Sequence, residues 1–156
     1  MGEKKKYRKV LFVCTGNTCR SPMAEIIFRS LQFEDGIDVI SRGTVVLFPE
    51  PANPRAVTVI SSHGMKLENH RARQLKEKDI TDDTLVLTMT VSQRNKLEKQ
   101  YELDGNLYTI KEFAGEEGDV LDPYGGDLVD YEKCYSELYR LVKKTCVKLN
   151  EELESS

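Results

Sequence analysis

Cys14 and Arg20, separated by the five small or polar residues of Cys14-Thr-Gly-Asn-Thr-Cys-Arg20, are the pair in this chain best suited to chemistry. The apolar residues 10–13 precede them and predict a buried strand, whereas Ser21-Pro22 is typical of a helix start, with Ser21 as the cap. Backbone N–H groups of a short loop that enters a helix converge on one concavity, where the helix dipole favours an anion. Because the guanidinium of Arg20 matches two phosphate oxygens, the segment predicts a phosphate-binding loop.

Cys14 begins this loop, so the same positive potential would stabilise its thiolate and present it to a bound phosphoryl group as a nucleophile. Gly16 is expected to supply a positive φ or a close backbone approach, and Asn17 tolerates the left-handed region. The Ser21 hydroxyl could hydrogen-bond the sulfur and ease its later departure. The alternative, a structural cysteine in an ordinary turn, leaves Arg20 and the polar loop unexplained.

A thiolate that attacks phosphorus needs a proton donor for the leaving group, and Asp122 is the strongest candidate. It lies in the glycine- and acid-rich residues 115–126, directly before a proline that restricts it to extended geometry and holds its carboxyl out from the loop. Leu121 and Tyr124 are expected to shield this carboxyl from water and so favour its protonated form. Asp119 is a local rival that lacks the proline constraint.

The run from Cys14 through Arg20-Ser21-Pro22, combined with Asp122-Pro123, resembles the low-molecular-weight protein tyrosine phosphatase family. The resemblance covers nearly the full length of the chain. It implies a hydrolase, a protein phosphatase that works through a cysteinyl-phosphate intermediate with Cys14, Arg20 and Asp122 as catalytic residues. No metal and no cofactor are expected, because Arg20 and the loop amides supply the charge stabilisation.

The same resemblance implies which residues bind the substrate and which support the loop. Ser41 and His70 would brace the loop through Asn17, with an ordinary surface histidine as the alternative for His70. Arg42 departs from the family's usual Ser-Ala-Gly-Thr at this point, and its role is open. The implied substrate-binding residues are Thr15, Gly16, Asn17, Thr18, Cys19, Ser21 and Tyr124.

Thr18 bears on which phosphorylated residue is the substrate. Tyrosine-specific members of the family usually carry an aliphatic residue at this position, and threonine replaces apolar wall with a hydroxyl. A phosphoarginine guanidino group prefers hydrogen-bond acceptors, whereas a phosphotyrosine ring prefers apolar walls. The loop and the Asp122 segment are similar to the bacterial protein-arginine phosphatase branch, although Tyr124 stands where that branch usually has phenylalanine. Phosphoarginine is therefore the favoured substrate, and phosphotyrosine is the alternative.

Two more remote functions remain open. Arsenate reduction uses a similar cysteine loop, but it needs resolving cysteines beyond the second helix, and residues 61–83 contain none. A non-catalytic phosphate-binding module would bind phosphate without turnover, and the presence of Asp122 argues against it. A nucleotide-binding P-loop is excluded because the loop does not end in Gly-Lys-Ser/Thr.

The composition of the chain limits its expected partners and its expected cellular location. The net charge of −3 argues against a general nucleic-acid partner, and no apolar run approaches the ~20 residues that a membrane span requires. We therefore expect a cytoplasmic protein whose partners are a phosphorylated protein substrate and inorganic phosphate or another oxyanion in the loop. With two histidines and no Cys-x2-Cys pair, a metal site is not expected.

The four cysteines do not imply a disulfide framework in a cytosolic protein. Cys14 and Cys19 share one loop, so either a reversible disulfide that protects the thiolate or a simple packing role for Cys19 is open. Cys134 and Cys146 are expected to be packing residues of the last helix.

Strands and helices alternate along the chain, which predicts an α/β three-layer sandwich with a parallel sheet and helices on both faces. The resemblance implies four strands in the order 2-1-3-4. Ligands of such sheets bind beyond the carboxyl ends of the strands, where Cys14 lies. The expected strands are 8–13, 37–41, 84–89 and 107–110, and the expected helices are 22–33, one that begins at Asn53-Pro54, one that Ser92 caps and that runs to 99, and 127–152.

We expect residues 1–156 to form a single phosphatase domain, with mobile ends at 1–6 and 152–156. The buried face of the last helix should comprise Leu128, Tyr131, Tyr135, Leu138, Val142 and Leu149. Residues 44–51 form a long loop with three apolar residues, Val46, Leu47 and Phe48, which either wall the active site or lie against the core.

Overall fold

The structure is a computed structural model that describes residues 7–31, 36–103 and 105–154, the side chains of residues 152–154 excepted. Within this part of the chain, four parallel strands form a sheet in the order β2-β1-β3-β4, which confirms the predicted fold class and strand order. The strands are β1 (Lys9–Cys14), β2 (Asp38–Gly43), β3 (Thr84–Thr88) and β4 (Leu107–Thr109).

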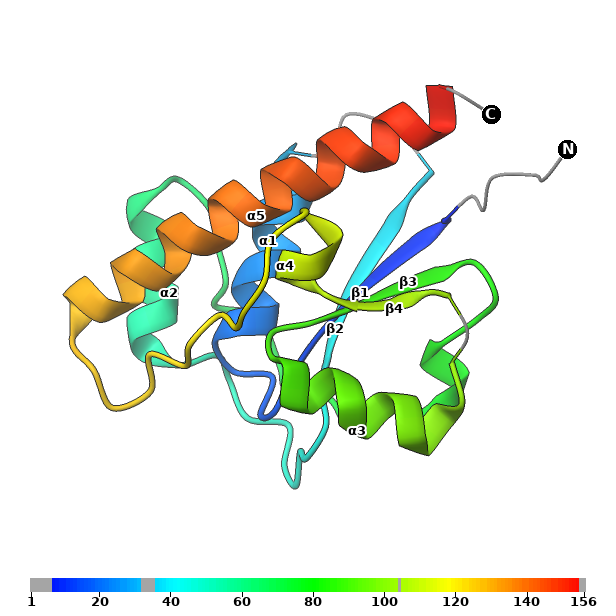
Figure 1. Cartoon of the computed structure of the whole chain (residues 1–156). Helices are drawn as coiled ribbons and strands as arrows, with labels where there is room; N and C mark the ends of the chain where they lie inside the picture. Colours follow the sequence, from blue (N-terminus) through cyan, green and yellow to red (C-terminus); the bar gives the residue numbers. More distant parts are fainter. Residues whose placement is uncertain (1–6, 32–35, 104, 155–156) are drawn as a thin grey trace, which may run out of the picture.

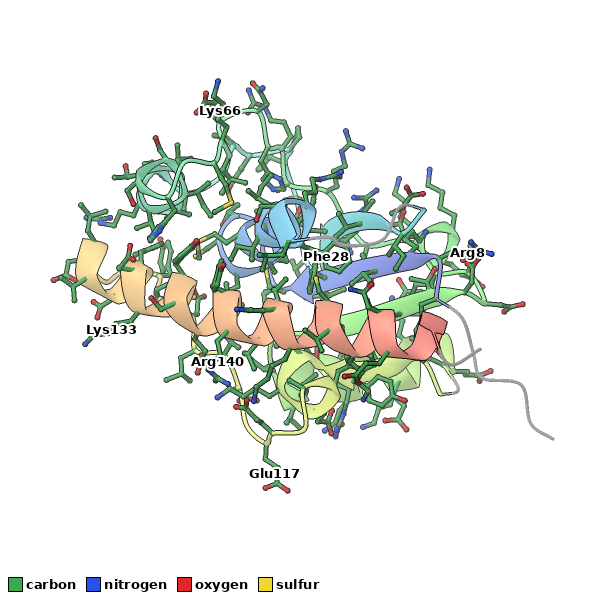
Figure 2. The ribbon with its side chains drawn as sticks, turned by 90° about the horizontal axis from the view of Figure 1, so that it is seen from above. Arg8, Phe28, Lys66, Glu117, Lys133 and Arg140 are labelled. Carbon is green, nitrogen blue, oxygen red and sulfur yellow. The ribbon has the colours of Figure 1, made fainter. Side chains whose placement is uncertain are left out.

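The two central strands are apolar because they are covered on both faces. In β1, Val10 and Phe12 belong to the larger core on one side of the sheet, whereas Leu11 and Val13 belong to a smaller core on the other. This alternation is the period of two that a strand imposes on its side chains. Phe28, labelled in Figure 2, meets Phe12 edge-on with ring centroids 6.1 Å apart.

The helices form the two outer layers, as predicted (Figure 1). One face of the sheet is covered by α1 (Arg20–Leu31), α2 (Pro54–Ser62), α4 (Ile110–Phe113) and α5 (Leu128–Glu154). The other is covered by α3 (Val91–Tyr101) and by the segment around the short 3-10 helix η1 (Glu77–Asp79). Figure 2 shows α5 running along the length of the molecule.

Two helix starts lie where the sequence predicts them. Asn53 caps α2, since its side-chain oxygen accepts a hydrogen bond from the backbone N–H of Arg55 at 2.9 Å. Asp127 does the same at the start of α5, where its Oδ1 accepts from the backbone N–H of Asp130 at 3.1 Å.

Two other predicted caps are wrong. Ser21 lies inside α1, and its hydroxyl contacts Cys14 and Asn17 instead of capping the helix. Ser92 lies inside α3, which is capped by Thr90 in a capping box with Gln93. In α1 the Ser21 hydroxyl contacts two side chains and no backbone N–H of the first turn. In α3 the neighbouring Thr90 makes the capping hydrogen bond.

The remaining boundaries differ from the predictions by one or two residues, apart from one helix end. Strand β2 continues to Gly43 because Gly43 stays paired with Cys14, and β4 ends at Thr109 because this residue caps α4, a helix that was not predicted. The predicted end of α1 at residue 33 lies outside the described residues. Leu128 is exposed, so the buried face of α5 begins only at Tyr131, while the other predicted members of that face are buried.

The chain ends at 1–6 and 152–156 were predicted to be mobile. Residues 1–6 and 155–156 lie outside the described residues, and residues 152–154 continue α5. No helix in the described part of the chain is long and apolar enough to cross a membrane.

Three segments that are distant in sequence gather at the carboxyl end of the sheet (Figure 1). They are the loop after β1 with residues 15–19, the loop after β2 with residues 44–53, and the residues 115–127 that precede α5. Each leaves an element anchored in the core, so the sheet sets their relative positions. The predicted nucleophile and the predicted acid therefore lie at the same end of the molecule.

Candidate active site

Asn17 is the buried centre of the loop that joins β1 to α1. Its backbone has a φ of +57°, in the left-handed region, and its side chain is fully buried. The amide Nδ2 donates to Ser21 Oγ at 2.8 Å and to Ser41 Oγ at 3.0 Å, and Oδ1 accepts from the backbone N–H of Arg73 at 2.9 Å. His70 Nε2 lies 2.7 Å from the backbone oxygen of Asn17. These contacts tie the loop to β2 and to the segment of residues 70–73.

Three carbonyl groups of the loop accept hydrogen bonds from backbone N–H groups of the segment after β2. The backbone N–H groups of Thr44, Val45 and Asn53 donate to the carbonyls of Cys14, Thr15 and Thr18 at 3.0, 3.1 and 2.8 Å. The side chain of Gln93 also donates to the Thr15 hydroxyl at 3.1 Å. With these acceptors engaged, the N–H groups of the loop are the backbone groups available to an anion.

Gly43 is the glycine that this arrangement needs, because a Cβ there would stand 2.7 Å from the Thr15 carbonyl oxygen and 3.1 Å from the Asn17 Cβ. The expectation of a positive φ at Gly16 is wrong, and a close approach of its backbone to a bound phosphate stays a prediction. Its φ is not positive, and a Cβ on it would meet only the Thr18 hydroxyl at an ordinary 3.8 Å. Asn17 takes the left-handed conformation instead, which it tolerates better than most residues.

The sulfur of Cys14 lies at the start of this loop, buried and 2.9 Å from the hydroxyl oxygen of Ser21. Because Ser21 Oγ already accepts a hydrogen bond from Asn17, its own O–H is free to donate to the sulfur. This O–H is positioned to stabilise negative charge on the sulfur when a bond to the sulfur breaks.

Arg20 links the loop to the segment that carries the predicted acid. Its NH1 donates to the carbonyl oxygen of Val120 at 2.9 Å, and its NH2 lies 3.6 Å from Asp122 Oδ2. Val120 is fully buried and donates its N–H to the carbonyl of Met89 at 2.8 Å. Asp119 Oδ1 accepts from the Val91 N–H at 2.8 Å, which makes this rival acid an anchor of the same segment.

The carboxyl of Asp122 is more open than the sequence predicts. Its side chain is 52% exposed, with Oδ1 accepting from the Tyr124 N–H at 3.0 Å. Leu121 and Tyr124 are 77% and 79% exposed, so the predicted shielding of the carboxyl by these side chains is wrong for this structure. Leu121 and Tyr124 lie in a segment in which Val120 and Pro123 are buried, whereas their own side chains are exposed to solvent.

Comparison with known proteins places this geometry in one family. The family described as "Low molecular weight phosphotyrosine protein phosphatase" matches residues 9–155. The chain belongs to this family. It is therefore a cysteine-dependent protein phosphatase of the metal-independent class that the family represents.

Relatives of this phosphatase carry two different substrate names. The low molecular weight protein-tyrosine-phosphatase PtpB of Staphylococcus haemolyticus is 38% identical over 136 residues, which cover 87% of this chain and 96% of the relative. The protein-arginine-phosphatase of Bacillus subtilis is 36% identical over 148 residues, covering 92% and 97%. A crystal structure of a low molecular weight protein tyrosine phosphatase from T. tengcongensis is 44% identical with a TM-score of 0.84, covering 90% and 98%. Similarity alone does not decide between the substrates.

Cys19 of the phosphatase is buried in the larger core, and it is a free thiol, as are Cys14, Cys134 and Cys146. A hydrogen bond with Cys134 and then burial raise the pKa of the Cys19 thiol far above its usual value. Cys19 therefore stays protonated, and its disulfide with Cys14 stays a prediction. The packing roles of Cys134 and Cys146 are confirmed, since both lie in the larger core.

Two features that the sequence left open now have a position. Arg42 is partly buried, pairs with Asp79 at 3.3 Å and donates to the Ser41 carbonyl at 2.8 Å, so it stabilises the end of β2. Leu47 and Phe48 are 84% and 68% exposed, which rules out the expectation that they lie against the core. Their role as a wall of the active site stays a prediction.

Three residues that support the loop were not predicted, and only one of them had a sequence signal. Gln93 is the fourth residue of the run that begins at Thr90, a capping-box pattern that places its side chain at the start of α3. Gln74 accepts from the Val46 N–H at 2.8 Å and donates to the Thr44 carbonyl at 2.9 Å. Arg73 acts through its backbone N–H, which no side-chain pattern can indicate.

Replacing Asn17 by alanine tests its role as the centre of the loop. The change removes three side-chain hydrogen bonds and leaves buried partners unpaired, so we expect the free energy of unfolding to fall by about 3 kcal/mol or more. Ser41→Ala removes one of these bonds and should cost about 1 kcal/mol. Urea unfolding measures both. Equal stability of Asn17→Ala and the parent would contradict the assignment.

His70 predicts a pH dependence of stability. Burial lowers its pKa below the ordinary 6.5, with Arg73 and Arg71 adding to the effect, while the hydrogen bond to Asn17 and the charge of Glu25 oppose it. The unfolded chain then binds a proton that the folded chain does not, so the His70 contribution is complete above about pH 6.5 and is lost as pH falls toward the folded pKa. Urea midpoints at about pH 7.5 and about pH 5.5 should differ less for His70→Gln than for the parent. An unchanged difference would contradict this origin.

Proposed function

We propose that this phosphatase hydrolyses phosphoarginine in proteins, with Cys14 as nucleophile, Arg20 as phosphate ligand and Asp122 as general acid and base. The observation that carries the proposal is the 3.6 Å contact between Arg20 NH2 and Asp122 Oδ2, together with the 2.9 Å contact between Ser21 and the Cys14 sulfur. Nucleophile, phosphate ligand and acid then occupy one site at the carboxyl end of the sheet. Geometry of this kind supports covalent phosphoryl transfer.

In the first step, the Cys14 thiolate attacks phosphorus while the loop N–H groups and Arg20 hold three phosphoryl oxygens. The bond from phosphorus to the leaving nitrogen breaks, and Asp122 donates its proton to that nitrogen. Arg20 uses one N–H on Val120, which leaves the rest of its five donors for the phosphoryl group and the neighbouring carboxylate.

In the second step, water attacks the cysteinyl-phosphate. Asp122, now a carboxylate, takes the proton of that water, and the bond between sulfur and phosphorus breaks. The departing thiolate accepts the hydrogen bond from Ser21, which stabilises its negative charge. Inorganic phosphate leaves, and Asp122 is protonated again for the next cycle.

Thr18 supports phosphoarginine as the substrate. Its carbonyl is fixed by the Asn53 N–H at 2.8 Å, and its residue is partly exposed in the loop. A hydroxyl at this position offers an acceptor to a guanidino group and reduces the apolar wall available to a phenyl ring. The half-exposed Asp122 carboxyl group also offers an oxygen acceptor to a guanidino leaving group. The similarity to a protein-arginine-phosphatase agrees with this preference.

Phosphotyrosine is the second candidate, and specific observations favour it. Two of the similar proteins are named tyrosine phosphatases. Leu121, Tyr124 and Phe48 are exposed apolar side chains on segments that flank the carboxyl end of the sheet, where an aromatic substrate would find partners. In either case we infer a phosphorylated protein substrate and a cytoplasmic location.

Hydrolysis of a generic aryl phosphate tests the assigned catalytic residues. Cys14→Ser should lower turnover by about 10⁴-fold or more, because it removes the thiolate nucleophile. Asp122→Asn should lower it by about 10²-fold to 10⁴-fold through loss of proton transfer. Asp119→Asn is the matched control, since its side-chain oxygen can still accept from Val91, and it should stay close to the parent. An Asp122→Asn variant as active as this control would remove Asp122 from the mechanism.

Thr18→Ile tests the substrate preference. Adding apolar wall and removing the hydroxyl should raise the ratio of kcat/KM for phosphotyrosine over phosphoarginine by about tenfold or more. Thr18→Val separates the two causes, because it removes the hydroxyl at nearly constant size. Parent protein that hydrolyses phosphotyrosine as fast as phosphoarginine would end the arginine proposal. An unchanged ratio in Thr18→Ile would show that Thr18 does not set the preference.

A further inference from the structure

A second cationic pocket lies behind the phosphate loop, at the edge of the sheet formed by β2. It has a volume of about 260 Å³ and is bounded by α1, by β2 and by the segment of residues 69–73. Its lining includes no residue of the loop between Cys14 and Arg20 and no residue of the segment that carries Asp122. The charged residues that line it are Glu25, Arg29, Arg42, Arg71 and Arg73, with His70 beside them.

The charges around this pocket are unbalanced. Arg29 pairs with Glu25 at 3.1 Å, and Arg42 pairs with Asp79 at 3.3 Å. Arg71 and Arg73 form no ion pair with any residue that the structure describes. Two guanidinium groups with no acidic partner beside one small pocket create a positive potential that an anion would relieve.

The guanidinium groups also have the right chemistry for a phosphate group. Each presents a planar fork of donors that matches two oxygens of a phosphate. Arg71 uses one of its donors on the His70 carbonyl at 3.0 Å, which orients its side chain and leaves the others free. The volume lies just below the range of ~300–1,000 Å³ that is usual for drug-sized ligands, so a compact anion fits better than a large organic one.

The pocket shares its walls with the support of the phosphate loop. Arg73 donates its backbone N–H to Asn17 Oδ1, His70 contacts the Asn17 carbonyl, and Ser41 accepts from the Asn17 amide. An anion held by the side chains of residues 71 and 73 would therefore fix the segment that fixes Asn17. Occupancy of the pocket should be felt at the catalytic loop through these three hydrogen bonds.

We propose that this pocket is a second binding site for a phosphate-class oxyanion, held chiefly by Arg71 and Arg73 and distinct from the catalytic loop. The ligand is either free inorganic phosphate or the phosphate group of a monoester. The proposal does not depend on which phosphorylated residue the enzyme hydrolyses, since it concerns binding and not turnover.

Side-chain NMR of the full-length protein tests this directly. The Nε–H signals of Arg71 and Arg73 and the ring signals of His70 report on the pocket, whereas the backbone N–H of Gly16 reports on the catalytic loop. Titration with inorganic phosphate at constant ionic strength should shift the pocket signals with their own dissociation constant, on the order of 1 mM. A parallel titration with methylphosphonate shows whether a substituted phosphate group also enters.

The two double variants remove equal charge, one inside the pocket and one outside it. Arg71→Gln/Arg73→Gln should weaken phosphate binding seen at His70 by about tenfold or more, while binding seen at Gly16 persists. Lys66→Gln/Lys78→Gln removes two exposed charges outside the pocket, and Lys66 is directed away from the molecule in Figure 2. This variant should leave the phosphate-binding curves observed at His70 and at Gly16 unchanged. The proposal is overturned if the pocket signals follow the Gly16 curve in every variant, if chloride produces the same shifts, or if both double variants lose binding equally.

Discussion

The buried amide of Asn17 is the constraint on which the phosphate loop depends. A loop of amides can hold a phosphoryl group only if its carbonyls point elsewhere, and such a backbone does not keep this shape by itself. Asn17 fixes it by taking the left-handed conformation and by joining α1, β2 and the segment of residues 70–73 through one side chain. The same side chain contacts Ser21, which in turn contacts the Cys14 sulfur, so the loop shape and the Ser21–Cys14 contact have one physical cause.

Asp122, the candidate acid, is positioned beside this loop by a contact of its neighbour Val120 with Arg20. Val120 is buried in the core, and its carbonyl accepts a hydrogen bond from the Arg20 guanidinium. Asp122, two positions later, therefore lies beside Arg20 while its own side chain stays half-exposed. An exposed Asp122 on an anchored segment can exchange protons with water between steps. In the proposed mechanism the loop would supply electrostatic stabilisation and Asp122 would supply proton transfer.

The sequence predicts most of the fold and indicates the candidate chemical residues, because both leave local signals. Strands β1 and β3 contain apolar runs, and the Cys14 to Arg20 spacing with Asp122-Pro123 predicts the two halves of the candidate site. The failures have a common origin in tertiary contacts. Ser21 was predicted to cap a helix but contacts Cys14. The positive φ expected at Gly16 is found at Asn17. Arg73 supports the loop through its backbone N–H, which no sequence pattern indicates. The exposure of Leu121 and Tyr124 likewise depends on where Val120 is anchored.

The most direct test of this account is to find the phosphoryl group on the enzyme. With an aryl phosphate that has a good leaving group, Asp122→Asn should slow hydrolysis of the intermediate more than its formation, because the second step needs the carboxylate as base. Rapid acid quenching followed by peptide mass spectrometry should then locate one phosphoryl group on Cys14. Continued turnover with no phosphoryl group on Cys14, or with the group on another residue, would contradict the account.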